Sequence, residues 1–450
     1  MSQPPDIRGT RAVPTSPGAL MMNAGSRLIP YDIPLRFFIA AALFHVLAWA
    51  LLAYGHAEVA GFIGGPGVVL AAVHALTLGV LVMCAMGAAY QLLSVATGVA
   101  LGSFFPCRLS SWLYIPGTAV LVGGMLSGDT SLMAIGGSLA VAGLVVFALV
   151  VGTFFHRAQT LKTTVRYGWA ALACLALLAV AGLALVFDFE GGFLDGAAWP
   201  DHLSMAAAHA ILGGYGFMGL LVMGFSHILV PMFALAAASD ERISVGILGV
   251  NLLAIGLAVA GVLRGEPAVV LAAGAVGLGG IGGHLWLMVT ALRNGMKKRL
   301  GLSFGLVRAG WVLLLVSILV GMAVVALPDV ERLAGLFGFI LLFGWLLTFL
   351  TGILQRILPF LASMHAHHAK RRAPRLTAMG HQNVTLKMHV ICHGLALAAI
   401  ALGIVIDTET LVLAGALSGA VGAAAYLWFA AGVAKHIIGF YGTENGAEAP

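Results

Sequence analysis

The chain has 450 residues, of which 61% are hydrophobic and only 9% are charged, and its mean hydropathy is +1.03. So little polar surface excludes a soluble globular domain and indicates a polytopic protein embedded in a lipid bilayer. The formal net charge of +6 comes from basic residues scattered through short loops, where they would face an anionic membrane surface. We therefore expect no nucleic-acid partner.

Apolar runs long enough to cross about 30 Å of hydrocarbon predict twelve transmembrane helices. None of the runs alternates with a two-residue period, so we expect an all-α membrane protein without strands. The predicted helices begin near residues 35, 67, 112, 132, 167, 203, 243, 268, 306, 333, 383 and 411.

The basic residues indicate the orientation, because cytoplasmic loops retain Lys and Arg. With the amino terminus inside, only Arg264 and Arg332 fall on the outer face. This predicts a multi-pass protein of a bacterial-type inner (cytoplasmic) membrane with both termini cytoplasmic. Residues 1–33 are a polar cytoplasmic tail and not a signal peptide, 34–440 form the membrane domain, and 441–450 are a C-terminal tail.

The helices fall into three groups of four, which predicts tandem repeat units at about 34–160, 161–300 and 301–440. An apolar residue followed by Arg opens the first helix of each unit, and a Gly followed seven positions later by Ser or Pro closes the second. These landmarks are Leu35-Arg36, Val165-Arg166 and Val307-Arg308, then Gly87 with Ser94, Gly224 with Pro231, and Gly352 with Pro359. Chance recurrence of common residues is the alternative.

Two histidine motifs open helices in the first two units. They are His74-Ala-Leu-Thr-Leu-Gly, followed by Gly87-Ala-Ala-Tyr-Gln-Leu-Leu, and His209-Ala-Ile-Leu-Gly-Gly-Tyr-Gly-Phe, followed by Leu229-Val230-Pro231-Met232-Phe233. With twelve helices in three units, they resemble subunit I of haem-copper oxidases and nitric oxide reductases, and more closely its reduced relatives such as the NnrS family. The resemblance implies a haem-copper oxidase subunit I-like fold and a membrane haem protein linked to electron transport or nitric oxide.

The chain departs from that family pattern where the oxygen-reducing centre would lie. Helix 7, Ile243 to Leu263, contains no His, and helix 10 contains none between Leu333 and Ser363. We therefore expect no standard binuclear centre. No Asp or Glu lies inside the twelve apolar runs, so we also expect no proton pumping.

Intramembrane histidines are the candidate site residues, because a buried imidazole needs partners for its nitrogens. An outer group, His74, His209 and His202, lies at the depth where the superfamily holds haem. The resemblance implies that His74 is an axial ligand of a non-covalent haem b and that His209 is a second axial ligand or a copper ligand. Hydrogen bonding across helix interfaces is the alternative for each.

An inner group of histidines is the candidate metal site. His389 and His393 lie at i and i+4 on one helix face, a workable geometry for copper or another transition metal, and His227 and His284 could complete it. His45, in the middle of helix 1, is expected to be packed and not ligating. The tract with His365, His367, His368 and His381 is expected to be a solvated basic loop.

Cysteine spacing limits the cofactor further. Four cysteines form neither Cys-x-x-Cys nor Cys-x-x-Cys-His, which excludes a covalently attached haem within this chain and makes structural disulfides unexpected.

Three functions stay open. The favoured one is a membrane haem protein that handles electrons from a cytochrome or quinol donor, or a small gas such as nitric oxide, and whether it is an oxidoreductase is left open. The alternatives are a copper transporter or metal-handling protein, and a non-catalytic assembly subunit.

Overall fold

The computed structural model describes residues 27–195, 200–371 and 383–441, which form twelve helical spans and contain no β-strand. The all-α fold with twelve spans is therefore confirmed. The spans formed by a single helix are α2 (Asp32–Tyr54), α5 (Phe105–Ser127), α6 (Thr130–Arg157), α7 (Lys162–Gly191), α10 (Glu241–Arg264), α11 (Pro267–Asn294), α12 (Gly301–Ala326), α16 (Val384–Ile406) and α17 (Glu409–Tyr441).

The remaining three spans each join two α-helices through a π-helical segment. They are α3 (Val68–Leu76), η3 (Thr77–Val82) and α4 (Met83–Thr97), then α8 (His202–Ile211), η5 (Leu212–Gly219) and α9 (Leu220–Ala234), and last α13 (Arg332–Phe339), η6 (Ile340–Leu347) and α14 (Thr348–His368).

Most spans begin within five residues of the predicted positions, and α5 is the exception. It begins at Phe105 instead of near residue 112. Pro106 stands in its first turn, where its missing N–H costs nothing, and the polar residues that follow hydrogen-bond back to the helix through Ser110 and Ser111. Hydropathy alone misses such a polar first turn.

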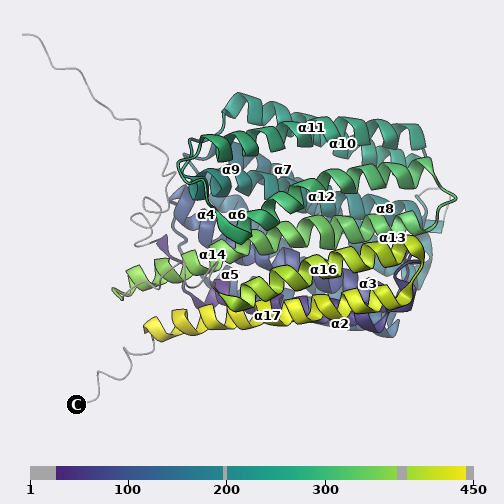
Figure 1. Cartoon of the computed structure of the whole chain (residues 1–450), viewed down its shortest axis with the longest axis horizontal. Helices are drawn as coiled ribbons and strands as arrows, with labels where there is room; N and C mark the ends of the chain where they lie inside the picture. Colours follow the sequence, from purple (N-terminus) through teal and green to yellow (C-terminus); the bar gives the residue numbers. More distant parts are fainter. Residues whose placement is uncertain (1–26, 196–199, 372–382, 442–450) are drawn as a thin grey trace, which may run out of the picture.

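The spans form one bundle in which α2 begins and α17 ends at the same end, on the left of Figure 1. We call this the terminal end and the opposite one the far end; α3, α8 and α13 lie towards the far end, and α4, α9 and α14 towards the terminal end. Of the predicted tails, residues 1–26 and 442–450 lie outside the described residues. Ile29 is already packed into the core before α2 begins.

The three spans with π-helical segments lie at the centre of the bundle. The second and sixth spans are the most buried, with 72% and 78% of their apolar window inside the protein, and η6 contacts both η3 and η5. A π turn inserts an extra residue and interrupts the regular hydrogen-bond ladder, and such segments often mark functional positions. They occur at the same place in the second helix of each predicted unit, which favours the three-unit division.

Three helix hairpins, α5 with α6, α10 with α11 and α16 with α17, pack closely through glycines that recur at fixed spacing. A Cβ added to the first glycine would lie 2.7 to 3.1 Å from the main-chain nitrogen of the residue nine positions later. These pairs are Gly124 with Met133, Gly261 with Val270 and Gly403 with Val412. A second glycine follows 19 positions after the first, at Gly143, Gly280 and Gly422, and each contacts the opposite helix. Small residues let transmembrane helices approach closely, so the three hairpins share one packing geometry.

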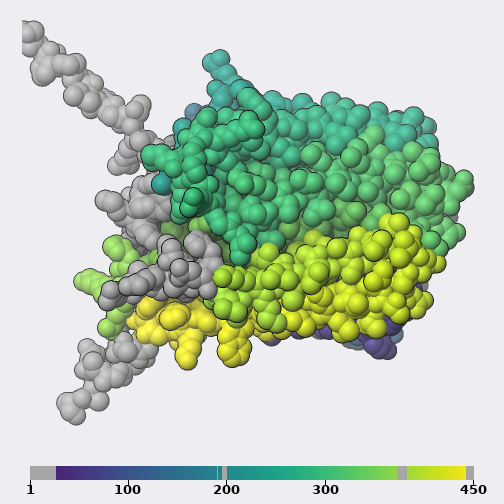
Figure 2. Space-filling view, in the orientation of Figure 1, coloured from purple at the N-terminus to yellow at the C-terminus, as the bar shows by residue number. Residues whose placement is uncertain are grey.

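The outside of the bundle is apolar, as a lipid-facing surface requires. Figure 2 shows one side, covered mostly from teal to yellow by the second and third predicted units, with part of the first unit visible at the lower edge. Four tryptophans are exposed on different helices: Trp112, Trp169, Trp286 and Trp428. A bilayer environment explains large apolar side chains on an outer surface.

Candidate functional site

His74 on α3 and His209 on α8 face each other towards the far end of the bundle. Their ring centres lie 6.4 Å apart, and the ring planes are 28° from parallel. Each histidine stands three residues before a π-helical segment, η3 or η5. The structure thus brings together the two histidines that the sequence placed in the outer group.

The protein holds the two rings of this pair differently. His74 Nδ1 donates to the carbonyl oxygen of Leu70 at 3.1 Å, which orients the ring and leaves Nε2 for a ligand. His209 Nδ1 is buried without a hydrogen-bond partner, and its ring packs against α7 at Gly182, where a Cβ would lie 2.9 Å from His209 Cε1. An imidazole held at one nitrogen and open at the other is typical of a metal-bound histidine.

His202 does not join this pair; it bonds to Asp188 instead. Its Nδ1 lies 2.7 Å from Asp188 Oδ2, and the other carboxylate oxygen accepts from Leu194 N at 2.7 Å. Asp188 belongs to the last turn of α7 and is 7% exposed, so a buried carboxylate lies at the end of this span. The hydrogen bonds to both oxygens explain how this carboxylate tolerates burial.

A second cluster lies between α2, α16 and α17 and contains His45, His389, His393 and Tyr426. The ring centre of His389 lies 5.7 Å from that of His45, 5.6 Å from that of His393 and 5.2 Å from that of Tyr426. All four side chains are 4% exposed or less. We call these residues the inner cluster.

The protein holds two of these imidazoles by one nitrogen each. His389 Nδ1 donates to the carbonyl oxygen of Gly422 at 3.1 Å, and His393 Nε2 lies 2.7 Å from Thr348 Oγ1, at the end of η6. The remaining polar atoms are buried without a partner: His45 Nε2, His389 Nε2, His393 Nδ1 and the Tyr426 hydroxyl. His45 is thus packed against His389 and Tyr426 and leaves one ring nitrogen without a partner.

His227 on α9 and His284 on α11 form a separate pair. Their ring centres lie 5.5 Å apart at 81°, and the Tyr167 ring lies 5.3 Å from His227. Both nitrogens of His227 and Nδ1 of His284 lack partners. The structure therefore separates the four histidines that the sequence predicted as one metal site. His389 and His393 belong to the inner cluster, and His227 and His284 form a pair elsewhere.

Within the described residues, no three or more His, Cys, Asp or Glu side chains are already gathered closely enough to hold a metal ion. His365, expected in a solvated loop, is instead buried at the end of α14, and its Nδ1 lies 3.0 Å from the Tyr441 hydroxyl. His381 lies outside the described residues.

Aligning the hairpins on Gly124, Gly261 and Gly403 shows what sequence reasoning missed. Phe147, His284 and Tyr426 each stand 23 positions after the first glycine of their hairpin. In the same alignment Tyr114, Asn251 and His393 are equivalent, because each stands ten positions before the first glycine of its hairpin. Glycine spacing is therefore the signal that could have drawn attention to Tyr426.

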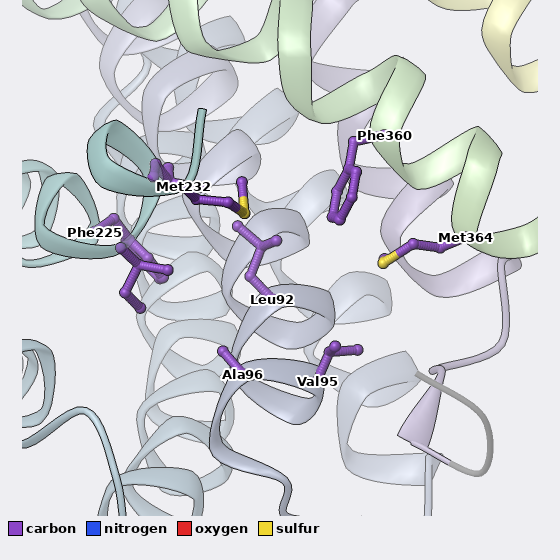
Figure 3. Close-up of a pocket in the computed structure, with 9 residues that line it drawn as sticks. Leu92, Val95, Ala96, Phe225, Met232, Phe360 and Met364 are labelled. Atoms are coloured by element: carbon purple, nitrogen blue, oxygen red, sulfur yellow. The ribbon is translucent and has the colours of Figure 1, made fainter. Parts of the chain in front are cut away.

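The terminal end of the bundle carries features of other kinds. A cavity of about 10 Å³ lies between α4, α9 and α14 and is lined only by apolar side chains, among them Leu92, Phe225 and Met364 (Figure 3). Nothing in this lining could orient a polar ligand.

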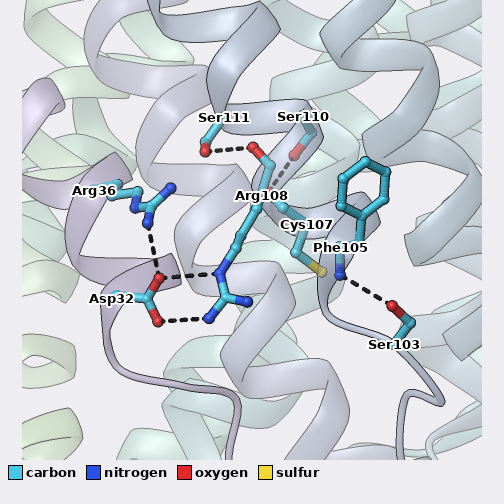
Figure 4. Close-up of polar contacts among 8 residues, drawn as sticks. All are labelled: Asp32, Arg36, Ser103, Phe105, Cys107, Arg108, Ser110 and Ser111. Carbon is cyan, nitrogen blue, oxygen red and sulfur yellow. Dashed lines mark hydrogen bonds and ion pairs between the residues drawn. The ribbon is translucent and has the colours of Figure 1, made fainter.

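An ion-pair network also lies at the terminal end (Figure 4). Asp32 accepts from Arg36 at 3.0 Å and from Arg108 at 3.2 and 3.3 Å, so it joins the starts of α2 and α5. Pairing with Asp32 accounts for Arg36 and Arg108 near the starts of their helices, and we assign both arginines a structural role.

No protein-family model matches the chain, and no curated protein matches it either.

Proposed function

We propose that the chain is a membrane haem protein, similar in organisation to the haem-copper oxidase core subunit, in which His74 and His209 are the two axial ligands of one non-covalent haem b iron. The observation that carries the proposal is the 6.4 Å separation of these two imidazoles. A haem in such a site supplies one-electron chemistry.

The separation fits two rings that share one iron. A histidine nitrogen binds a metal at about 2 Å, and the ring centre lies about 1 Å beyond that nitrogen. Two imidazoles on opposite sides of one ion therefore have centres about 6 Å apart. The observed distance of 6.4 Å is close to this value.

Ligation by both histidines favours electron transfer over gas chemistry. A histidine on each side fills both axial positions, so a gas could bind only by displacing one of them. We therefore propose electron transfer as the main role, with a cytochrome or quinol donor, and nitric oxide handling as the runner-up. The three-unit architecture is part of the proposal, supported by the recurring π-helical segments and glycines.

The orientation completes the proposal: both termini would be cytoplasmic in a bacterial-type inner membrane. The basic residues of the terminal end support this assignment through the positive-inside rule.

The test is the absorption spectrum of detergent-purified protein, oxidised and then dithionite-reduced, from cells with adequate haem supply. We expect sharp reduced bands of a low-spin haem that do not change with carbon monoxide. His74→Ala and His209→Ala should each lose this spectrum, whereas His284→Phe, which removes an equally buried imidazole elsewhere, should keep it.

Other outcomes point to other functions. A haem that binds carbon monoxide in the wild type would favour the gas-handling role. A colourless protein that contains copper would favour metal handling, and one with neither would favour an assembly subunit.

A further inference from the structure

The inner cluster contains more unpartnered polar atoms than a packed interface needs. His45, His389, His393 and Tyr426 come from three helices, and each leaves one nitrogen or its hydroxyl buried without a hydrogen bond. Each such group costs about 1–3 kcal/mol when it is left unsatisfied. Four of them in contact indicate that the cluster is built to bind something.

Space for a ligand lies beside the cluster. A cavity of about 10 Å³ is lined by His45, Tyr426, Cys84 and Thr351 together with apolar side chains of α2, η3 and α14. This is room for about one water molecule or one small ion, and not for an organic molecule. The cavity reaches His45 and Tyr426 but not His389, and it limits a ligand at that edge of the cluster to a single small species.

The chemistry of the lining selects the ion. The side chains that line the cavity and form the cluster offer imidazole, thiol and hydroxyl groups and include no Asp or Glu. A divalent ion held by neutral ligands alone would keep its full charge in a site surrounded by hydrocarbon, at a large cost. Soft monovalent copper(I) prefers imidazole and sulfur ligands and carries half that charge.

We propose that His45 and His389 bind one copper(I) ion through their Nε2 atoms, between α2 and α16. Both Nε2 atoms are free, and the ring centres lie 5.7 Å apart, close to the separation of about 6 Å for two imidazoles on opposite sides of one ion. Two-coordinate binding, which copper(I) accepts, needs no third ligand already in place. The carbonyl oxygen of Gly422 fixes the His389 ring from behind.

This site is independent of the proposed haem. It shares no residue with the His74–His209 pair, so the haem proposal can fail while the copper proposal holds, and the reverse.

The test measures copper(I) bound to the purified protein. Copper(I) is supplied anaerobically as its acetonitrile complex, in competition with bicinchoninate, and its ligands are identified by X-ray absorption. We expect one copper ion per chain with nitrogen neighbours at about 2 Å. His45→Phe and His389→Phe should each weaken binding by more than about 100-fold.

Two further variants keep the test decisive if a phenylalanine variant does not fold. His45→Met replaces the imidazole by a thioether, which copper(I) also binds, so copper should stay bound and acquire a sulfur neighbour at about 2.3 Å. His284→Phe is the matched control and should bind copper like the wild type.

Any of three results would overturn the proposal: no copper bound by the wild type, unchanged binding in the folded His45 and His389 variants, or loss of copper from His284→Phe alone. Retention of copper by a haem-free His74→Ala protein would show that the two sites are separate. Loss of copper from that folded variant would also count against the site.

Discussion

Replacing Gly136 by alanine tests the close packing of the α5–α6 hairpin. The added Cβ would contact the main-chain nitrogen of Leu121 and would lie 2.7 Å from its Cα, whereas ordinary contacts begin at 3.4 Å. Main-chain atoms cannot rotate away, so the two helices must move apart. Overpacking of this kind costs about 1–3 kcal/mol of unfolding free energy.

Gly123→Ala is the matched control, because Gly123 lies on the same hairpin and an added Cβ meets nothing within 4 Å. Alanine is more favourable than glycine in a helix by up to about 1 kcal/mol, and this gain is common to both variants. The difference between them therefore isolates the packing cost, and Gly136→Ala should be less stable by about 1–3 kcal/mol. Gly415→Ala should fall between them, since its nearest main-chain atom, the Ala396 carbonyl oxygen, is 3.1 Å away and only the Ile400 side chain is closer, at 2.7 Å.

The assay is reversible unfolding in mixed micelles, followed by a thiol-reactive dye. Cys84, Cys107 and Cys174 are buried and free, so the dye reports unfolding. If Gly136→Ala proves as stable as Gly123→Ala, the hairpin is not packed as closely as we describe.

Three more predictions use the same unfolding assay. Tyr114→Phe removes a hydroxyl that donates to a main-chain carbonyl of η3 at 3.1 Å and should cost about 1 kcal/mol; no loss would mean that the π-helical segment does not need this bond. Asp188→Asn should cost about 1–3 kcal/mol because the buried carboxylate accepts two hydrogen bonds, and combining it with His202→Ala should add less than the single effects predict. Arg108→Gln should lower the unfolding free energy by at most about 1 kcal/mol, since its ion pair with Asp32 is partly exposed. A larger loss would mean that the ion pairs of Figure 4 contribute more than partly exposed pairs usually do.

The number of spans and the places where they begin could be predicted from the sequence because both depend on local composition. An apolar run of sufficient length must form a helix in lipid, whatever its neighbours are. The start of α5 was predicted too late in the chain because the prediction relied on local hydropathy. Its first turns carry Arg108, Ser110 and Ser111, which are helical but lower the local hydropathy.

The candidate site could be predicted only in part. His74 and His209 were predicted together because both lie at a similar depth near the start of the second helix of a predicted unit. His45 could not be joined to His389 from spacing, because α2 and α16 lie near opposite ends of the chain. Tyr426 was within reach only through the glycine spacing of the α16–α17 hairpin. Asp188 was missed because its hydrogen-bond donors, His202 and Leu194, come after the end of its helix.

The shared geometry of the three hairpins has a consequence for how the chain acquires new chemistry. One backbone position carries a phenyl ring at Phe147, an imidazole at His284 and a phenol at Tyr426. If the units arose by duplication, a reactive side chain was gained at this position by substitution alone, and the packing of the helices around it did not change. Exchanging residues between equivalent positions is then a direct way to move a binding group from one unit to another.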